Sequence, residues 1–187
     1  EQIRAEWSVE LAAIERAVFP TAGIEDLLVP EEIEVYCDTF PEGGFVALHE
    51  GRPVGMGVGI FIDFDFDDSH HSLDDLIGEN SCGNHSADGD WYYGITIAVD
   101  PGYRRLGIGH QLYIRRKDLV RRFAKAGIVA GGVIPGYKDH IHAMSADDYG
   151  DKVVAGERYD RIVGYKLGEM PESSPIWSEV DLGEVPF

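Results

Sequence analysis

A strand, a helix and a second strand in the middle of the chain restrict the fold more than any other feature. Residues 92–99 alternate larger and smaller side chains, and residues 100–102 form an Asp-Pro-Gly turn. Apolar residues then follow helical spacing over residues 107–125, and the apolar run 128–134 comes next. Two strands joined by a crossover helix pair in parallel. The segment therefore predicts an α/β or α+β domain with a mixed sheet.

The N-terminal part of the chain adds helices and a hairpin to this unit. We expect a short strand at residues 3–6, followed by a helix that Ser8 caps. Pro30 suits the first turn of a second helix. Residues 45–49 and 54–62 form the two strands of a hairpin. The predicted order up to this point is strand, helix, helix, strand, strand.

The remaining regions are less regular. Residues 63–90 form a long acidic loop with a brief helix at Leu73–Ile77, and such loops are functional or disordered. Ser145 begins a capped helix that reaches about Ala155. Further on, residues 162–167 form a helix or a strand and residues 176–180 a last strand. At 187 residues and 44% hydrophobic content, we expect a single domain over the whole chain.

The charge of the chain excludes two classes of partner. Asp and Glu number 34 against 16 Lys and Arg, a formal net charge of -18, which repels nucleic acid and anionic membranes. Only five of the basic residues are Lys, so the acidity suits either a protein of a salt-loving organism or a site that attracts cations. With two cysteines and no membrane-length apolar run, we expect a cytoplasmic protein.

The basic residues concentrate where the glycines lie. Eight of the sixteen fall between positions 104 and 125, which indicates either an anionic ligand or a solvated helix face. The sequence Arg-Arg-Leu-Gly-Ile-Gly at residues 104–109 opens the predicted helix, so its glycines let the backbone approach a ligand and its first-turn amides favour a pyrophosphate. The segment has no Gly-Lys-Ser/Thr, which a nucleotide P-loop needs, and it has Leu112 where a dinucleotide-binding loop has its third glycine.

Residues 97–109 resemble the cofactor motif of the GNAT-type N-acetyltransferase superfamily, Arg/Gln-x-x-Gly-x-Gly/Ala after a strand and a Pro-containing turn. The resemblance covers about residues 3–167 and is strongest over residues 92–134. It implies a mixed, mostly antiparallel central sheet flanked by helices, with a V-shaped cofactor cleft where the central strand splays at a β-bulge. Residues 130–137 and 144–160 look, more loosely, like acetyltransferase domains joined to carbon-nitrogen hydrolases.

The resemblance also implies an activity and a set of binding residues. The expected reaction moves an acetyl group from acetyl-coenzyme A to a primary amine, small molecule or peptide, by direct attack in a ternary complex, and a homodimer is compatible with it. A strand amide would stabilise the oxyanion. The cofactor would be held by Ile97, Ala98, Val99, Arg104, Arg105, Leu106, Gly107, Ile108 and Gly109.

The catalytic acid and base are harder to place. Tyr93 stands near the position where the family often has Glu, so no base is assigned. Tyr165 resembles the family's acid but lacks the Gly-Phe pair that normally follows, and a structural tyrosine is the competing interpretation. His140 and His142, after the second strand, are alternative bases or exposed loop residues.

The acidic loop could instead be read as a metal site. His70, His71 and His85 occur there with the carboxylates Asp63, Asp65, Asp67 and Asp68, but no spacing defines a coordination geometry, so we expect no metal. The loop joins the hairpin to the central strand and is predicted to border the acceptor. Because the motif lacks a clear catalytic signature and the chain lacks an initiator Met, a non-catalytic acyl-coenzyme A sensor or scaffolding domain, or part of a larger fused enzyme, is the alternative.

Overall fold

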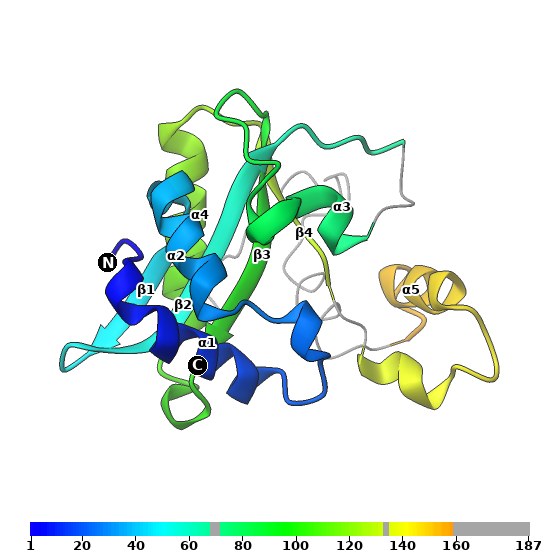
Figure 1. The fold of residues 1–187 in the computed structure, drawn as a ribbon. Coiled ribbons are helices and arrows are strands. Elements are labelled where there is room, and N and C mark those ends of the chain that lie inside the picture. Colours follow the sequence, from blue (N-terminus) through cyan, green and yellow to red (C-terminus); the bar gives the residue numbers. More distant parts are fainter. Residues whose placement is uncertain (68–71, 133–134, 159–187) are drawn as a thin grey trace. The chain divides into compact units, whose positions relative to one another are not determined.

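A computed structural model describes residues 1–67, 72–132 and 135–158 of the chain. The chain divides into two compact units, Glu1–Ala130 and Gly131–Phe187. Figure 1 traces both units. Whether they act as the single predicted domain stays a prediction.

The first unit is built on a four-stranded sheet in the order β1-β2-β3-β4. Its strands are β1 (Phe45–His49), β2 (Arg52–Ile62), β3 (Trp91–Val99) and β4 (Gly127–Ala130). The pairs β1–β2 and β2–β3 are antiparallel, and β3–β4 is parallel. The predicted mixed, mostly antiparallel sheet is confirmed.

Helices cover both faces of this sheet. On one face lie α1 (Ser8–Val18) and α2 (Pro30–Thr39), and on the other lies α4 (Ile108–Arg122) (Figure 1). The division follows from alternation along β2, because successive residues of a strand point to opposite faces. Ile60 joins the core beneath α1 and α2, whereas Phe61 packs with Leu119 and Val120 of α4. Each face therefore has its own apolar core.

Glycines on β2 bring α4 close to the sheet. An ideal Cβ at Gly55 would lie 3.2 Å from the Ile108 side chain, and one at Gly57 would lie 3.4 Å from Nε of Arg116. Larger residues at these positions would push the helix outward. The close packing fixes where the N-terminus of α4 lies relative to the strands.

The hairpin between β1 and β2 has a shorter turn than predicted. Arg52 already pairs with His49, and Pro53 pairs with Leu48, so only Glu50 and Gly51 form the turn. Both have positive φ, 50° and 79°, as the favoured two-residue turns require. β1 ends where predicted, and β2 begins two residues earlier than apolar patterning indicates.

Two predictions at the N-terminus were wrong. Residues 3–6 form no strand; Gln2 makes an isolated bridge to Phe45, and Ala5–Trp7 is a 3-10 helix. Ser8 is the first residue of α1, not its cap, and its hydroxyl donates to the Glu34 carboxylate at 3.0 Å. A carboxylate on the neighbouring helix α2 therefore takes the hydroxyl that was expected to bind the helix end.

The second strand of the crossover and its helix also differ in detail. β4 ends at Ala130 rather than 134, and residues 131 and 132 lie outside any strand. Phe123, expected on the buried side of the helix, follows the last residue of α4 and is 41% exposed. The elements predicted at 162–167 and 176–180 lie outside the described residues.

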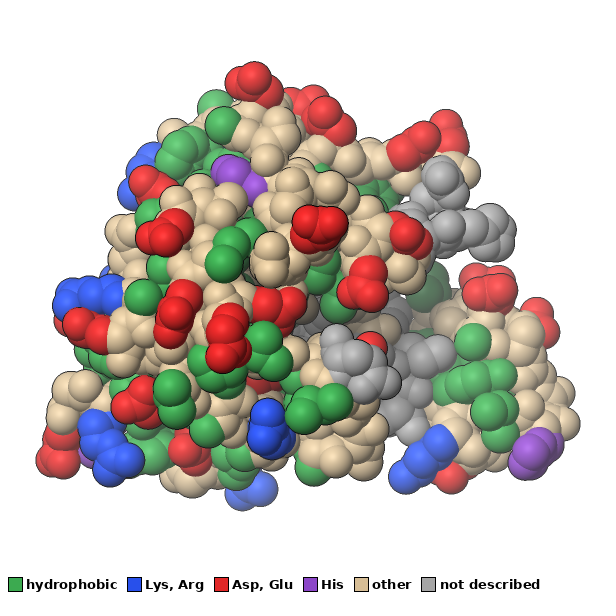
Figure 2. All heavy atoms as spheres, viewed as in Figure 1, with side chains coloured by type: hydrophobic (Ala, Val, Ile, Leu, Met, Phe, Trp, Pro, Cys, Tyr) green, Lys and Arg blue, Asp and Glu red, His purple; other side chains and the backbone are tan. Residues whose placement is uncertain are grey.

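The acidic segment is more regular than a loop over its second half. The predicted brief helix is present as α3 (Leu73–Ile77), where Ser72 and Asp75 form a capping box. After it, the amide of Ser86 donates to the carbonyl of Phe61 at 2.9 Å, which ties the segment to the end of β2. Acidic side chains are also scattered over the face seen in Figure 2, so the negative charge is not confined to this segment.

The second unit contains the predicted helix α5 (Ala146–Val154). The hydroxyl of Ser145 accepts a hydrogen bond from the Asp148 amide at 3.1 Å, as a helix cap does. Tyr149 and Val153 form the buried side of the helix.

Within the ranges that the structure describes, no helix has both the length and the apolar character needed to cross a membrane.

Candidate functional site

The pairing between β3 and β4 covers only the first half of β3. Their pairing runs from Trp91 with Gly127 to Gly94 with Ala130 and ends there. At the same level the β2–β3 ladder shifts register, since Val58 pairs with Thr96 but Gly59 pairs with Gly94. Ile95 is therefore the extra residue of a β-bulge. The bulge that the resemblance implies for the central strand is therefore present.

Because of the bulge, Tyr93 and Val99 point to opposite faces of the sheet. Tyr93 belongs to the core beneath α1 and α2, whereas the Val99 side chain lies 4.0 Å from the ideal Cβ of Gly109 on α4. With strict alternation, two residues six positions apart would share a face. The regular pattern of large side chains in the sequence therefore hides the extra residue.

The open part of β3 presents the backbone groups of Ile97 and Val99. The amide of Asp100 donates to the Val54 carbonyl at 2.9 Å, so this residue pair is hydrogen-bonded to β2. In an antiparallel ladder such pairs alternate, and the intervening residues point their amides and carbonyls the other way. Ala98 points its backbone towards β2 and its 1% exposed side chain into the core. Contact of Ile97 and Val99 with a cofactor stays a prediction.

The turn after β3 is held by local contacts. The Asp100 carboxylate accepts from the Gly102 amide at 2.7 Å, and Nε of Arg104 donates to the Val99 carbonyl at 3.4 Å. Arg105 has a φ of 63°, which is uncommon outside glycine. Leu106 is 68% exposed. The three side chains at positions 104–106 thus lie at the surface, beside the end of the open strand.

The N-terminus of α4 has amides without helical partners. Its first bond runs from the Gln111 amide to the Gly107 carbonyl at 3.0 Å, which leaves the amides of Ile108, Gly109 and His110 without an acceptor within the helix. Gly107 has a φ of 76° and starts the helix in the left-handed conformation. Because the ideal Cβ of Gly109 lies 4.0 Å from the Val99 side chain, these amides lie at the end of β3. The positive end of the helix dipole is suited to an anion there.

A buried carboxylate that the sequence did not single out lies beside the bulge. Glu15 of α1 is 3% exposed, and its Oε2 accepts from the Leu28 amide at 2.8 Å. Burial raises the pKa of the Glu15 carboxyl, and the Thr96 hydroxyl and the Leu28 amide offset only part of this rise. The Thr96 hydroxyl makes no hydrogen bond of normal geometry with any described residue. The sequence does contain a signal for this residue, because Glu15 is a charged residue four positions after Leu11, on the apolar side of the helix.

The tyrosines considered for catalysis differ in how far the structure informs on them. Tyr93, at the position where the family often has Glu, is 5% exposed and stacks on Phe64 with ring centres 6.3 Å apart. Its neighbour Tyr92 donates to the Gly43 carbonyl at 2.8 Å, and burial raises the pKa of Tyr92 to about 12. Tyr165 lies outside the described residues.

Two of the histidines considered at the sequence level have structural partners. Nδ1 of His85 accepts from the Phe61 amide at 3.2 Å and its ring stacks on Phe40, while burial lowers the pKa of His85. Nε2 of His140 lies 3.1 Å from a guanidinium nitrogen of Arg158. Since arginine only donates, Nε2 of His140 is the acceptor in this contact. His142 is exposed.

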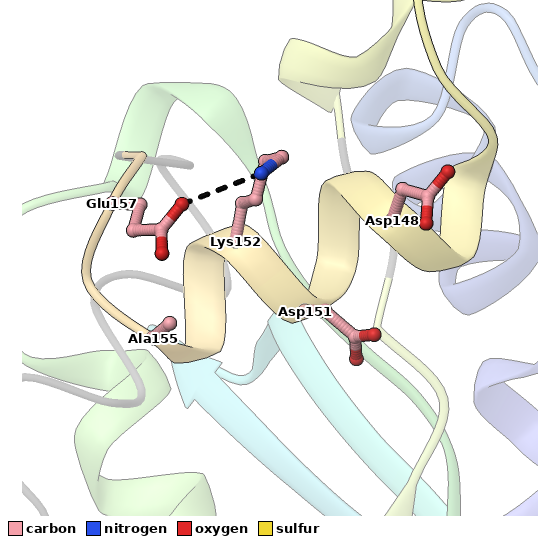
Figure 3. Close-up of a pocket in the computed structure, with 5 residues that line it drawn as sticks. All are labelled: Asp148, Asp151, Lys152, Ala155 and Glu157. Atoms are coloured by element: carbon pink, nitrogen blue, oxygen red, sulfur yellow. Dashed lines mark hydrogen bonds and ion pairs between the residues drawn. The ribbon is translucent and has the colours of Figure 1, made fainter.

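The hollow in the second unit is not lined by any of the predicted cofactor residues. Among the described residues, no three His, Cys, Asp or Glu side chains are grouped to hold a metal ion, and His70 and His71 lie outside that set. Figure 3 shows a hollow in the second unit, where Nζ of Lys152 pairs with the Glu157 carboxylate at 3.3 Å. Its lining consists of Asp148, Asp151, Lys152, Ala155 and Glu157.

Comparison with known proteins places this geometry in a family. The model of the acetyltransferase (GNAT) family matches residues 9–131. An uncharacterized N-acetyltransferase of Bacillus subtilis, YkwB, is 30% identical over 84% of this chain and 70% of its own length. The probable hydrolase YhcX of the same organism is 38% identical over 73% of this chain. The match spans only 27% of the length of YhcX.

Solved structures share the fold. A GNAT-like decarboxylase, GphF, in complex with isobutyryl-CoA superposes with a TM-score of 0.68 at 22% identity, over 90% of this chain and 83% of that one. The loading GNATL domain of CurA from Lyngbya majuscula gives 0.61 at 19% identity, over 78% and 69%. From the family match over residues 9–131 and the similarity to YkwB, we conclude that this chain belongs to the acetyltransferase (GNAT) family.

Proposed function

We propose that this chain binds acetyl-coenzyme A and transfers its acetyl group to a primary amine, of a small molecule or a peptide. The supporting observation is the continuity between the open edge of β3 and the unpaired amides of α4. The strand edge suits the amides and carbonyls of a pantetheine arm, and the helix end suits a pyrophosphate. The residues that would hold the cofactor are those of β3 from Ile97 to Val99 and of the turn and helix from Arg104 to Gly109.

Direct attack of the amine on the thioester is the mechanism we propose. In a ternary complex, the amine nitrogen bonds to the carbonyl carbon and loses a proton, the carbon–sulfur bond breaks, and the departing thiolate takes up a proton. A strand amide at the bulge would stabilise the oxyanion. Because no covalent acetyl-protein forms on this route, the protein mixed with acetyl-coenzyme A alone should keep its mass.

Thiol release tests the proposal. Acetyl-coenzyme A should bind in calorimetry, and a panel of primary amines should include acceptors that raise the rate of free thiol release above the rate with acetyl-coenzyme A alone. Tertiary amines of matched size serve as controls, since they have no N–H to lose after attack. A chain that does not bind acetyl-coenzyme A would refute the proposal.

A second candidate function is binding without transfer, as a sensor or as part of a larger fused enzyme. Tyr93 favours it, because a buried phenol stands where the family often has a carboxylate base. The partial match to a probable hydrolase of much greater length favours the fused arrangement. Binding of acetyl-coenzyme A without thiol release for any amine would support this candidate over the transferase.

A further inference from the structure

Arg116 is a buried charge on α4 that the transfer mechanism does not use. The sequence places it in a basic run that could be a solvated helix face, but the side chain is 1% exposed. None of the ion pairs among the described residues includes it. Burying a guanidinium away from a carboxylate is unfavourable, so its other contacts must account for its presence.

Those contacts lie at the β-bulge. One terminal nitrogen, Nη2, donates to the Val58 carbonyl at 2.9 Å and also to the Thr96 carbonyl. Val58 and Thr96 are the last residues paired in register before the ladder shifts. The rings of Tyr92 and Tyr113 lie 5.6 Å and 5.5 Å from the guanidinium carbon. The charge is thus held by two carbonyl dipoles and two aromatic rings.

Glycines make the space for this side chain. An ideal Cβ at Gly94 would lie 2.9 Å from Nη1 of Arg116, closer than real contacts allow, and one at Gly57 would lie 3.4 Å from Nε. Gly94 is also the last β3 residue paired with β4. The guanidinium therefore sits where the pairing of β3 with β4 ends.

We propose that Arg116 is a positioning residue that fixes the β-bulge of β3 and thereby determines which backbone groups face the open edge. If the extra residue were absorbed, the outer half of β3 would slip by one position against β2. The groups of Ile97 and Val99 would then turn towards β2, and those of Ala98 would face outward. By holding the carbonyls of both strands at the shift, Arg116 prevents this slip. The inference rests on the proposed function, because the open edge is the proposed pantetheine site.

Two ligands separate this role from general stabilisation. Acetyl-coenzyme A reaches both the helix end and the strand edge, whereas 3′-phosphoadenosine 5′-diphosphate, its nucleotide half, lacks the pantetheine arm. In Arg116→Met, we expect acetyl-coenzyme A to bind at least about tenfold more weakly, as for two lost backbone hydrogen bonds. The nucleotide half should bind within about twofold of wild type. Arg116→Lys should recover part of the loss, because an ammonium can donate to one of the carbonyls.

Arg115→Met is the matched control, since Arg115 is the exposed neighbour on the same helix and loses the same charge. It should leave the ratio of the two dissociation constants unchanged. If Arg116→Met does not fold, Gly94→Ala replaces it, because its methyl displaces the guanidinium. An unchanged ratio in a folded variant, with wild type binding both ligands, overturns this inference alone. A wild-type chain that binds neither ligand overturns the proposed function as well.

Discussion

Substitution of Gly109 by Val tests the cofactor segment without disturbing the fold. The ideal Cβ of Gly109 lies 4.0 Å from the Val99 side chain, which is an ordinary contact. Valine is a better helix former than glycine by a few tenths of a kcal/mol, so the unfolding free energy should change by less than about 0.5 kcal/mol. For a chain of this size, this corresponds to roughly 2 °C in Tm.

Binding should respond far more strongly than stability. The branched side chain would occupy the space in front of the first-turn amides, where the pyrophosphate is proposed to lie. Loss of one hydrogen bond to a charged group costs about 1.5–3 kcal/mol, so we expect acetyl-coenzyme A to bind roughly 10- to 150-fold more weakly. Titration calorimetry measures the affinity, and scanning calorimetry of the same sample measures Tm.

Two other glycines can take the same substitution by Val, one as an alternative test and one as a control. Gly107 is a poorer test, because its φ of 76° makes any side chain strained by about 1–2 kcal/mol, and a loss of binding would be confounded with a loss of stability. Gly150 of α5 is the matched control, since its ideal Cβ meets no atom within 4 Å among the described residues. Gly150→Val should bind as wild type does. Wild-type affinity in Gly109→Val would refute the assignment of the segment to the cofactor.

Three further predictions concern charge. The folded-state pKa of Glu15 lies above the ordinary 4.5, so the contribution of this carboxyl to the unfolding free energy falls as pH rises from the ordinary pKa to the folded-state pKa. In urea unfolding, the stability of Glu15→Gln relative to wild type should therefore increase with pH. A pH-independent difference would contradict this. If the acidity is salt adaptation, Tm should rise between about 0.1 and 1 M salt as repulsion is screened, and a flat Tm would favour a substrate-specific charge. Replacing Asp65, Asp67 and Asp68 together with Asn should raise KM for a cationic acceptor at low salt but not the Kd of acetyl-coenzyme A; an unchanged KM would exclude the acidic segment from the mechanism.

The elements that could be predicted from the sequence depend on neighbours close along the chain. The hairpin of β1 and β2, the crossover through α4 and the capped helix α5 follow from periodicity and turn residues, and all are present. The glycine-containing segment is also local, because Gly107 caps α4 and Gly109 lies in its first turn; its contact with a cofactor stays a prediction. Errors occur where a distant residue decides the outcome. Ser8, for example, pairs with Glu34 on another helix instead of capping its own.

The family resemblance predicts a bulge in the central strand, but the side-chain pattern of β3 does not show where it lies. Large side chains at positions 93, 95, 97 and 99 keep an unbroken alternation, so no local signal marks the extra residue. The bulge coincides with contacts that come from elsewhere in the chain: Arg116 from α4 reaches both carbonyls, and Gly57 and Gly94 leave it room. None of these residues is unusual alone, since an arginine in a basic run suits a solvated helix face. Their meaning depends on three elements being packed together, which is a property of the tertiary structure.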